Sequence, residues 1–336
     1  MIELDQFLSA NPQIDFGIKV AKQIARTVKP VYGNKQKDVP INEISHDFNY
    51  VLDAVAEGIV KASFQRAWRK RILYGYVTED QGKVIPPDGK PDWIFLIDPV
   101  DGSRPANIGA EMACVNIAII RGDINNPTLA DVEGAVVLAI KERKMLVARK
   151  GFGVHEVAPA TGRNAALIEI KAKENVTSQL KDVSLVYETY SMSAELTGIV
   201  IDPLLEEVSF KTEYPSDSYS ALSLVRGQNE LHVDLRRRLV LDYPYLPVML
   251  KPNSKALGPM DIAPEFLILK ELGMVVTDAH GVLLDKARLW KFNSDGSWSD
   301  DIQLSWIVAA TPVLHQQAMN KIEKGFANLS KKYPRL

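Results

Sequence analysis

The stretch "WIFLIDPVDGS", Trp93 to Ser103, is the part of the sequence that decides the fold. Five apolar residues run directly into two aspartates, Asp98 and Asp101. A short apolar run of this kind, bounded by turn-forming residues, indicates a strand buried on both faces. Pro99 cannot donate to a sheet ladder and fixes its own φ, so the regular alternation of side chains stops there. We therefore expect Asp98 and Asp101 to converge at the end of a buried strand.

Paired carboxylates of this kind favour a metal site. Two neighbouring negative charges repel each other, and a cation that neutralises both removes the repulsion. Aspartate is a hard oxygen ligand, and the sequence has no Cys/His cluster with zinc-ligand spacing, so Mg²⁺ or Mn²⁺ is favoured. The Val100 carbonyl could add an oxygen, and the N–H groups of Gly102 and Ser103 could hold phosphate. The alternative is structural, with Asx turns at both aspartates and Gly102 serving turn geometry.

Two further acidic segments strengthen the metal interpretation. "GYVTEDQG" places Glu79 and Asp80 after an apolar strand, and "GPMDIAPEFLILKELG" places Asp261 before a helix that should stop at Gly273. Pro264 is tolerable in the first turn of that helix. The alternative role for Asp261 is that of a helix N-cap.

Composition indicates an ordinary globular chain and excludes several function classes. A length of 336 residues predicts two domains or one large two-part fold, and the net charge of -2 gives no overall attraction for nucleic acid or an anionic membrane. The basic run 236–238 is expected to be a solvated turn or strand end. Cys114 is the only cysteine, so no intrachain disulfide can form and a cytoplasmic location is expected.

The pattern of segments predicts an α/β fold with two different halves. Apolar residues recur at helical spacing before residue 60, with Asp47 at the head of that helix, and β-rich runs follow at 114–120, 134–140 and 144–149. Beyond residue 160 strand-like and helix-like segments alternate, which is typical of a βα-layered region. We predict an α+β domain over 1–160 that carries most metal ligands, and an α/β domain over 161–336 that contributes Asp261 and substrate contacts.

Two ordered signatures resemble those of the magnesium-dependent, lithium-sensitive phosphatase superfamily of inositol monophosphatases, fructose-1,6-bisphosphatases and 3′-phosphonucleotide phosphatases. "WIFLIDPVDGS" is similar to an apolar strand followed by Asp-Pro-(Ile/Leu/Val)-Asp-Gly-(Thr/Ser). "MDIAPEFLILKELGMVVTDAHG" resembles Trp-Asp-x-Ala-Ala followed by a helix and Gly-Gly-x-x-(Ser/Thr)-Asp-x-x-Gly. The resemblance implies a layered αβαβα sandwich, a phosphoric monoester hydrolase and a homodimer.

The same resemblance implies a role for each matching residue. Glu79, Asp98 and the Val100 carbonyl would bind one Mg²⁺, while Asp98, Asp101 and Asp261 would bind a second. Glu79 would also help to hold a weaker third ion, and is counted with the catalytic residues.

The remaining implied roles concern the water and the substrate. Asp47 and Ser103 would orient and deprotonate the attacking water, and the Gly102 and Ser103 N–H groups would hold the phosphate. Ser218, in "YPSDSYSALSLVRG", would contact the substrate, with a helix cap as its alternative.

Departures from the family pattern leave the substrate open. Thr78 stands where the family often has Gly, Met260 where it has Trp, and "RPANIG" (104–109) where a Thr-Asn-Phe-like segment is usual. An inositol monophosphatase-like activity is the first expectation, with fructose-1,6-bisphosphatase or 3′(2′),5′-bisphosphate nucleotidase activity as alternatives. A catalytically inactive metal- or ligand-binding regulatory homologue is the alternative from another class. A haloacid-dehalogenase-type phosphatase is disfavoured because its two aspartates are separated by one residue, not two.

Overall fold

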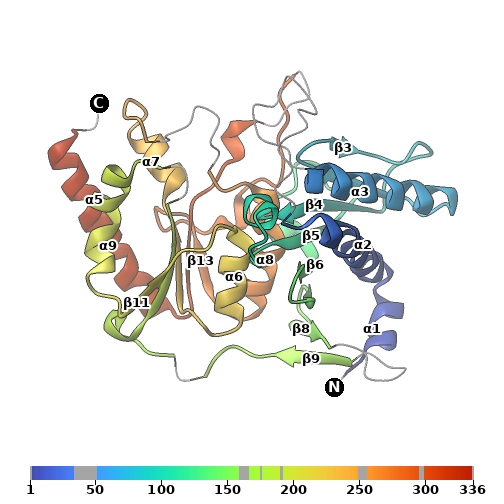
Figure 1. Ribbon diagram of the computed structural model, residues 1–336, viewed down its shortest axis with the longest axis horizontal. Helices are drawn as coiled ribbons and strands as arrows, with labels where there is room; N and C mark the ends of the chain where they lie inside the picture. Colours follow the sequence, from blue (N-terminus) through green and yellow to red (C-terminus); the bar gives the residue numbers. More distant parts are fainter. Residues whose placement is uncertain are drawn as a thin grey trace. The chain divides into compact units, whose positions relative to one another are not determined.

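The computed structural model describes residues 2–33, 51–158, 166–174, 176–189, 192–248, 256–294 and 299–334. Asp47 lies outside the described residues. The chain forms two compact units: unit 1 is Met1–Lys171 with Pro259–Leu272 and Asp285–Ile302, and unit 2 is Ala172–Gly258 with Gly273–Leu284 and Gln303–Leu336. Both units combine helices with a sheet, so the protein has the α/β fold that the sequence predicts (Figure 1).

Unit 1 is built on a large sheet in which β2 and β4 pair in parallel and the other neighbours pair antiparallel. The strands, in hydrogen-bonded order, are β1 (Ile2–Glu3), β9 (Ala166–Ile170), β8 (Val154–Val157), β7 (Lys144–Arg149), β6 (Val132–Ala139), β5 (Cys114–Arg121), β4 (Trp93–Asp101), β2 (Tyr74–Thr78) and β3 (Gly82–Val84). The predicted runs at 114–120, 134–140 and 144–149 are confirmed as β5, β6 and β7.

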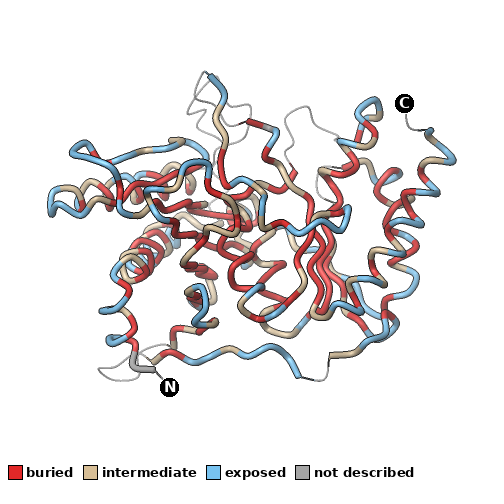
Figure 2. Tube along the Cα trace, turned by 180° about the vertical axis from the view of Figure 1, so that it is seen from behind, coloured by how far each residue is buried: buried red, intermediate tan, exposed pale blue. Residues whose placement is uncertain are grey.

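Helices cover both faces of this sheet. On one face, α1 (Leu4–Ala10), α2 (Pro12–Val28) and α3 (Val51–Arg69) share a core with Phe95 and Ile97 of β4. On the other, α8 (Pro259–Glu271) packs against β4, β5, β6 and β7. The central strands β4 to β7 are buried along most of their length, whereas the helices alternate between buried and exposed residues (Figure 2). This pattern is the helical period that the sequence shows.

The arrangement of α8 differs from the halves expected over 1–160 and 161–336. Although α8 lies late in the sequence, it belongs to unit 1, because its apolar side chains pack on that sheet. Asp261 therefore lies in the same compact unit as Glu79, Asp98 and Asp101. The division of the chain into two domains, over 1–160 and 161–336, stays a prediction.

Unit 2 contains a mixed sheet in the order β11 (Phe210–Thr212), β10 (Ser184–Glu188), β12 (Leu231–Asp234), β14 (Trp306–Ala309) and β13 (Val275–Thr277). β10 pairs in parallel with β11 and β12, whereas β14 runs antiparallel to its neighbours. The helices are α5 (Ala194–Leu205), α6 (Asp217–Val225), α7 (Arg236–Asp242) and α9 (Pro312–Lys332). The order β10, α5, β11, α6, β12 confirms the alternation of strands and helices expected beyond residue 160.

The basic run 236–238 is a correction to the sequence-based expectation. Arg236 and Arg238 are buried in α7 and not solvated. The Arg238 guanidinium donates to the Ala279 carbonyl at 2.6 Å and to Glu323, and it stacks on the Phe326 ring at 3.7 Å. Because arginine has five donors and a flat cation, it can be buried where acceptors and aromatic rings surround it. Among the described residues, no helix combines the length and apolarity that a bilayer crossing requires.

Candidate active site

A bulge at the end of β4 puts its two aspartates on the same face of the sheet. Asp98 lies opposite Asn116 and Asp101 lies opposite Cys114, with a register shift between the two pairs. Asn116 and Cys114 are two residues apart on β5 and so share a face, which means that their partners share it too. Val100 instead joins the core on the opposite face. The irregularity falls where Pro99 predicts one, since proline cannot donate to the ladder.

The carboxylate of Asp98 also shapes the local backbone. Its Oδ1 accepts the main-chain N–H of Val100 at 3.0 Å, which forms an Asx turn. The structural alternative considered for this aspartate is therefore present. It does not compete with a metal role, since one N–H occupies one of the roughly four acceptor positions of an ionised carboxylate.

The electrostatics of Asp98 show that the predicted acidic residues are neighbours. Burial raises the pKa of Asp98 well above its usual range, and the charges of Asp101, Asp261 and Glu79 raise this pKa further. The Val100 N–H bond lowers it only in part. Negative charges so placed disfavour ionisation of one another, and a bound cation would reverse that effect. The four carboxylates therefore form one acidic cluster within unit 1.

Helix α8 carries Asp261 to the cluster. Asn116 is the partner of Asp98 on β5, and its Nδ2 group donates to the Asp261 carbonyl at 3.5 Å. Asp261 therefore lies over the same face of the sheet as Asp98. α8 begins at Pro259, so Asp261 lies inside its first turn and the N-cap alternative is wrong. Pro264 falls in the second turn and not in the first. A carboxylate in the first turn is favoured by the partial positive charge of the helix N-terminus.

Glu57, which the sequence interpretation missed, lies buried behind the turn that carries Glu79. Gln81 donates from Nε2 to Glu57, accepts the Tyr76 hydroxyl at 2.8 Å, and donates from its main-chain N–H to Thr78 Oγ1 at 3.2 Å. Burial raises the pKa of Glu57 to about 7, and the hydrogen bonds from Gln81 and Thr78 lower it only in part.

This network also explains why a threonine can occupy the position where related sequences often have glycine. The Thr78 hydroxyl closes the turn between β2 and Gln81. The spacing of Glu57 with Val60 and Phe64, which are both fully buried on α3, is the sequence signal that could have revealed it.

The divergent segment 104–109 continues a short helix, α4 (Ser103–Asn107), directly after the acidic strand end. Gly102 precedes α4 with φ of 82°, a left-handed conformation that glycine adopts without strain. The segment is anchored from two sides, because the Gly33 N–H donates to the Ala106 carbonyl at 2.9 Å and Lys141 Nζ donates to the Gly109 carbonyl at 2.8 Å. Ser103 is the first residue of α4 and is half-buried.

Comparison with known proteins identifies the family. A sequence model described as the inositol monophosphatase family matches residues 10–325. The chain belongs to the inositol monophosphatase family. The family is named for the hydrolysis of a phosphomonoester, and membership supports the superfamily resemblance of the two acidic signatures.

Individual relatives of this inositol monophosphatase family member are distant. A curated bifunctional NADP phosphatase/NAD kinase from Methanococcus maripaludis is 22% identical over 279 residues, a match that covers 80% of this chain and 44% of that protein. The chain thus spans less than half the length of that relative. The solved Thermotoga maritima IMPase is 17% identical with a TM-score of 0.63, and covers 95% of this chain and 99% of its own. A solved inositol monophosphatase–fructose 1,6-bisphosphatase is 19% identical with a TM-score of 0.63, at 91% and 98% coverage. These structures share the fold.

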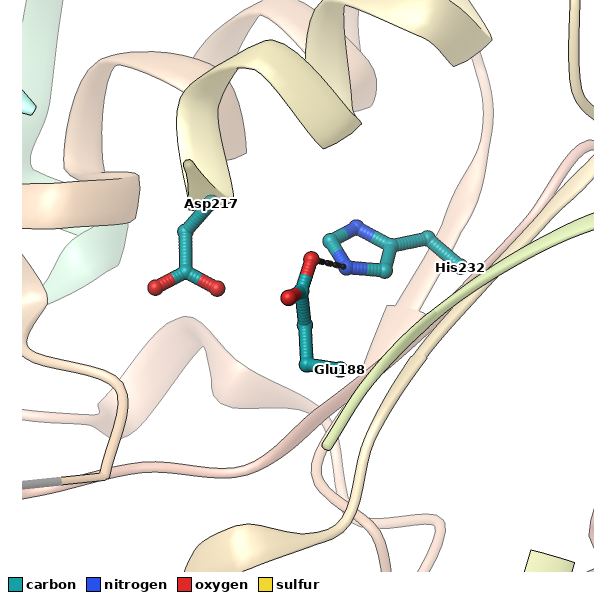
Figure 3. A group of neighbouring side chains, drawn as sticks. All are labelled: Glu188, Asp217 and His232. Atoms are coloured by element: carbon teal, nitrogen blue, oxygen red, sulfur yellow. Dashed lines mark ion pairs between the residues drawn. The ribbon is translucent and has the colours of Figure 1, made fainter. Parts of the chain in front are cut away.

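Unit 2 of this family member contains a second polar cluster, which the sequence interpretation also missed. Glu188, Asp217 and His232 lie next to one another (Figure 3). Ser216, and not Ser218, caps α6, since its Oγ accepts the Tyr219 N–H at 3.1 Å. The cap alternative for Ser218 is therefore wrong. Ser218 is fully buried in the first turn of α6, and its substrate contact stays a prediction.

Proposed function

We propose that this chain is a Mg²⁺-dependent phosphomonoesterase that hydrolyses a small phosphorylated metabolite, with an inositol monophosphate as its first substrate class. The observation that carries the proposal is that the charges of Asp101, Asp261 and Glu79 raise the pKa of Asp98. All four carboxylates belong to one unit of the fold. Simultaneous ionisation of all four carboxylates is unfavourable because their charges repel, and two or three bound divalent cations would make it favourable. The donor set fits Mg²⁺, or Mn²⁺, because it consists of hard carboxylate oxygens.

The proposed ligands divide as the family resemblance implies. Glu79, Asp98 and the Val100 carbonyl would hold one ion, and Asp98, Asp101 and Asp261 a second, with Glu79 near a third. When bound, such ions stabilise the charge on the entering and leaving oxygens of an in-line displacement at phosphorus.

The remaining chemistry belongs to side chains and backbone. We propose that the Asp47 carboxylate and the Ser103 hydroxyl orient the attacking water. The Ser103 hydroxyl would pass the proton of the water to Asp47, which would act as the general base. The Gly102 and Ser103 N–H groups would hold phosphate oxygens at the turn after β4. Ser218 is proposed as a substrate contact in unit 2. A cytoplasmic homodimer completes the proposal, and sedimentation of the purified chain would measure its mass.

A second substrate class has its own support. The name of the curated relative includes an NADP phosphatase activity, which favours a phosphorylated dinucleotide. Fructose 1,6-bisphosphate and a 3′-phosphonucleotide stay as the alternatives that the family resemblance implies. The anchored but divergent segment 104–109 adjoins the acidic cluster in sequence, and its residues are where we expect the choice among these substrates to be made.

The test is phosphate release from a panel of inositol monophosphate, fructose 1,6-bisphosphate, 3′-phosphoadenosine 5′-phosphate and NADP, with Mg²⁺ and with a chelator. We expect turnover of at least one substrate and its loss with the chelator. Asp101→Asn should lower kcat by about 100-fold or more, the scale on which charge-stabilising groups act. The matched control Asp123→Asn changes a side chain that is 79% exposed and should leave kcat unchanged. Equal activity with and without the chelator, or in Asp101→Asn, would contradict the mechanism.

A further inference from the structure

The polar cluster of unit 2 joins three elements of that unit around one point. Glu188 ends β10, Asp217 begins α6 and His232 lies on β12. One ligand atom from each of the three side chains lies within 4.8 Å of the other two (Figure 3). The register explains the geometry: His232 lies opposite Val186, two residues before Glu188, so both polar side chains project from the same face of the sheet.

His232 is a buried side chain without hydrogen bonds. Its exposed fraction is 0%, and neither ring nitrogen makes a hydrogen bond to any residue that the structure describes. Nε2 lies 3.3 Å from a Glu188 carboxylate oxygen, and the Trp306 ring packs edge-on against the imidazole at 5.1 Å. Burial lowers the pKa of His232 to about 3, so the ring is neutral and keeps one nitrogen lone pair. Buried polar atoms without partners are rare and call for a ligand or another cause.

The charges around His232 leave an excess of negative charge. Three carboxylates, those of Glu188, Asp217 and Asp234, face one guanidinium, that of Arg236. Arg236 donates to Asp234 at 2.6 and 2.9 Å and to both oxygens of Asp217 at 3.0 and 3.1 Å. When all three carboxylates are ionised, two negative charges remain, which is the charge that one divalent cation neutralises.

We propose that Glu188, Asp217 and His232 form a binding site for one divalent transition-metal ion of the zinc type. One imidazole nitrogen with two carboxylates is a ligand set that suits Zn²⁺, whereas Mg²⁺ favours oxygen ligands alone. The 3.3 Å between Nε2 and the Glu188 oxygen matches the distance of about 3.3 Å between two ligands of a tetrahedral Zn²⁺ with bonds of about 2.0 Å.

Neighbouring groups already hold the two carboxylates in place. The Ser220 hydroxyl donates to Glu188 at 2.6 Å, and Arg236 holds Asp217. Hydrogen bonds of this kind orient the ligands of metal sites. The ion would tie β10, β12 and α6 together. None of its three ligands belongs to the carboxylate cluster of unit 1, so this site does not depend on the proposed function.

The test measures zinc binding directly, in a chain from which the proposed magnesium ligands have been removed. The full-length Asp98→Asn/Asp101→Asn protein is freed of metal, and its Zn²⁺ content is measured by equilibrium dialysis in excess Mg²⁺. We expect one Zn²⁺ per chain. X-ray absorption should show one imidazole among ligands at about 2.0 to 2.1 Å. Absence of bound Zn²⁺, or a spectrum without imidazole, overturns the proposal.

Variants in the same background identify the ligands. His232→Phe and Glu188→Gln should each weaken Zn²⁺ binding by more than about 100-fold, and Ser220→Ala by about 10- to 100-fold. The matched control is His315→Gln, which changes another histidine of unit 2, one bonded to Thr277 at 2.7 Å, and should leave the affinity unchanged.

Thermal unfolding, measured without metal, checks that each variant folds. If His232→Phe does not fold, the Zn²⁺ affinity of Glu188→Gln decides the outcome. Unchanged Zn²⁺ affinity in Glu188→Gln overturns the proposal. Loss of phosphatase activity in the double-Asn chain with zinc binding retained would separate this site from the proposed catalytic site.

Discussion

Replacing Glu57 with glutamine should make the protein more stable at alkaline pH. The pKa of Glu57 is raised from 4.5 to about 7, with burial as the largest cause. The folded state therefore keeps the proton that the unfolded chain loses as pH rises through this window. The contribution of Glu57 to stability is fully present below pH 4.5 and is lost as pH rises through about 7, above which the side chain is ionised in both states. A pKa raised from 4.5 to about 7 corresponds to about 3 kcal/mol of free energy of unfolding, of which about 2 kcal/mol is lost between pH 5 and pH 8.

Glutamine has nearly the shape of glutamate and cannot ionise. Gln81 can still donate to the carbonyl oxygen of the new side chain, as it now donates to Glu57. The variant should therefore lack the pH-dependent loss, and its stability relative to the natural chain should rise by about 2 kcal/mol between pH 5 and pH 8.

The assay for this effect is urea unfolding of both chains at the two pH values, with a chelator present throughout. The control is Glu133→Gln, which removes a carboxylate with a 42% exposed side chain in the same unit and should show no such change. A difference in free energy of unfolding between Glu57→Gln and the natural chain that is equal at pH 5 and pH 8 would refute the argument from burial.

Two matched pairs in unit 2 extend the predictions to packing and buried charge. A Cβ on Gly325 would lie 1.9 Å from the Val200 carbonyl oxygen, so Gly325→Ala should destabilise the protein by about 2 kcal/mol although alanine has the better helix propensity. Gly198 has open space around it, so Gly198→Ala should stabilise the protein by up to about 1 kcal/mol. Arg238→Met should lower the free energy of unfolding by about 3 kcal/mol, because it leaves buried acceptors without their cation. Arg237→Met should lower it by under about 1 kcal/mol. Urea unfolding measures all four, and equal effects within either pair would contradict the packing described.

Some elements of this fold follow from local sequence because their signals are local. The apolar run before Asp98 predicts a buried strand, and β4 is one. The tight connection after residue 140 predicts the β6–β7 hairpin, and Gly273, with φ of 73°, ends α8 as expected. In each case the pattern of side chains alone matches one backbone period or one φ value.

Other elements were not evident because their stability comes from contacts far along the chain. β12 has only four residues and follows α6 after a turn at Gly227, and it becomes a strand because β10 and β14 pair with it on both sides. Arg236 and Arg238 read as a solvated basic run, yet acidic side chains from α6 and α9 make their burial favourable. Local sequence contains no record of partners that are tens of residues away.

The sequence by itself determined the family signatures and the identity of the acidic residues, because Asp98, Pro99 and Asp101 act within a few bonds of one another. Only the tertiary structure decided that Asp261 joins them, because α8 packs on the sheet of unit 1. It also decided that Glu57 and His232 are buried, which shifts the pKa of each away from its ordinary value. Burial and charge proximity are properties of the folded chain, since both depend on which residues surround a group in space.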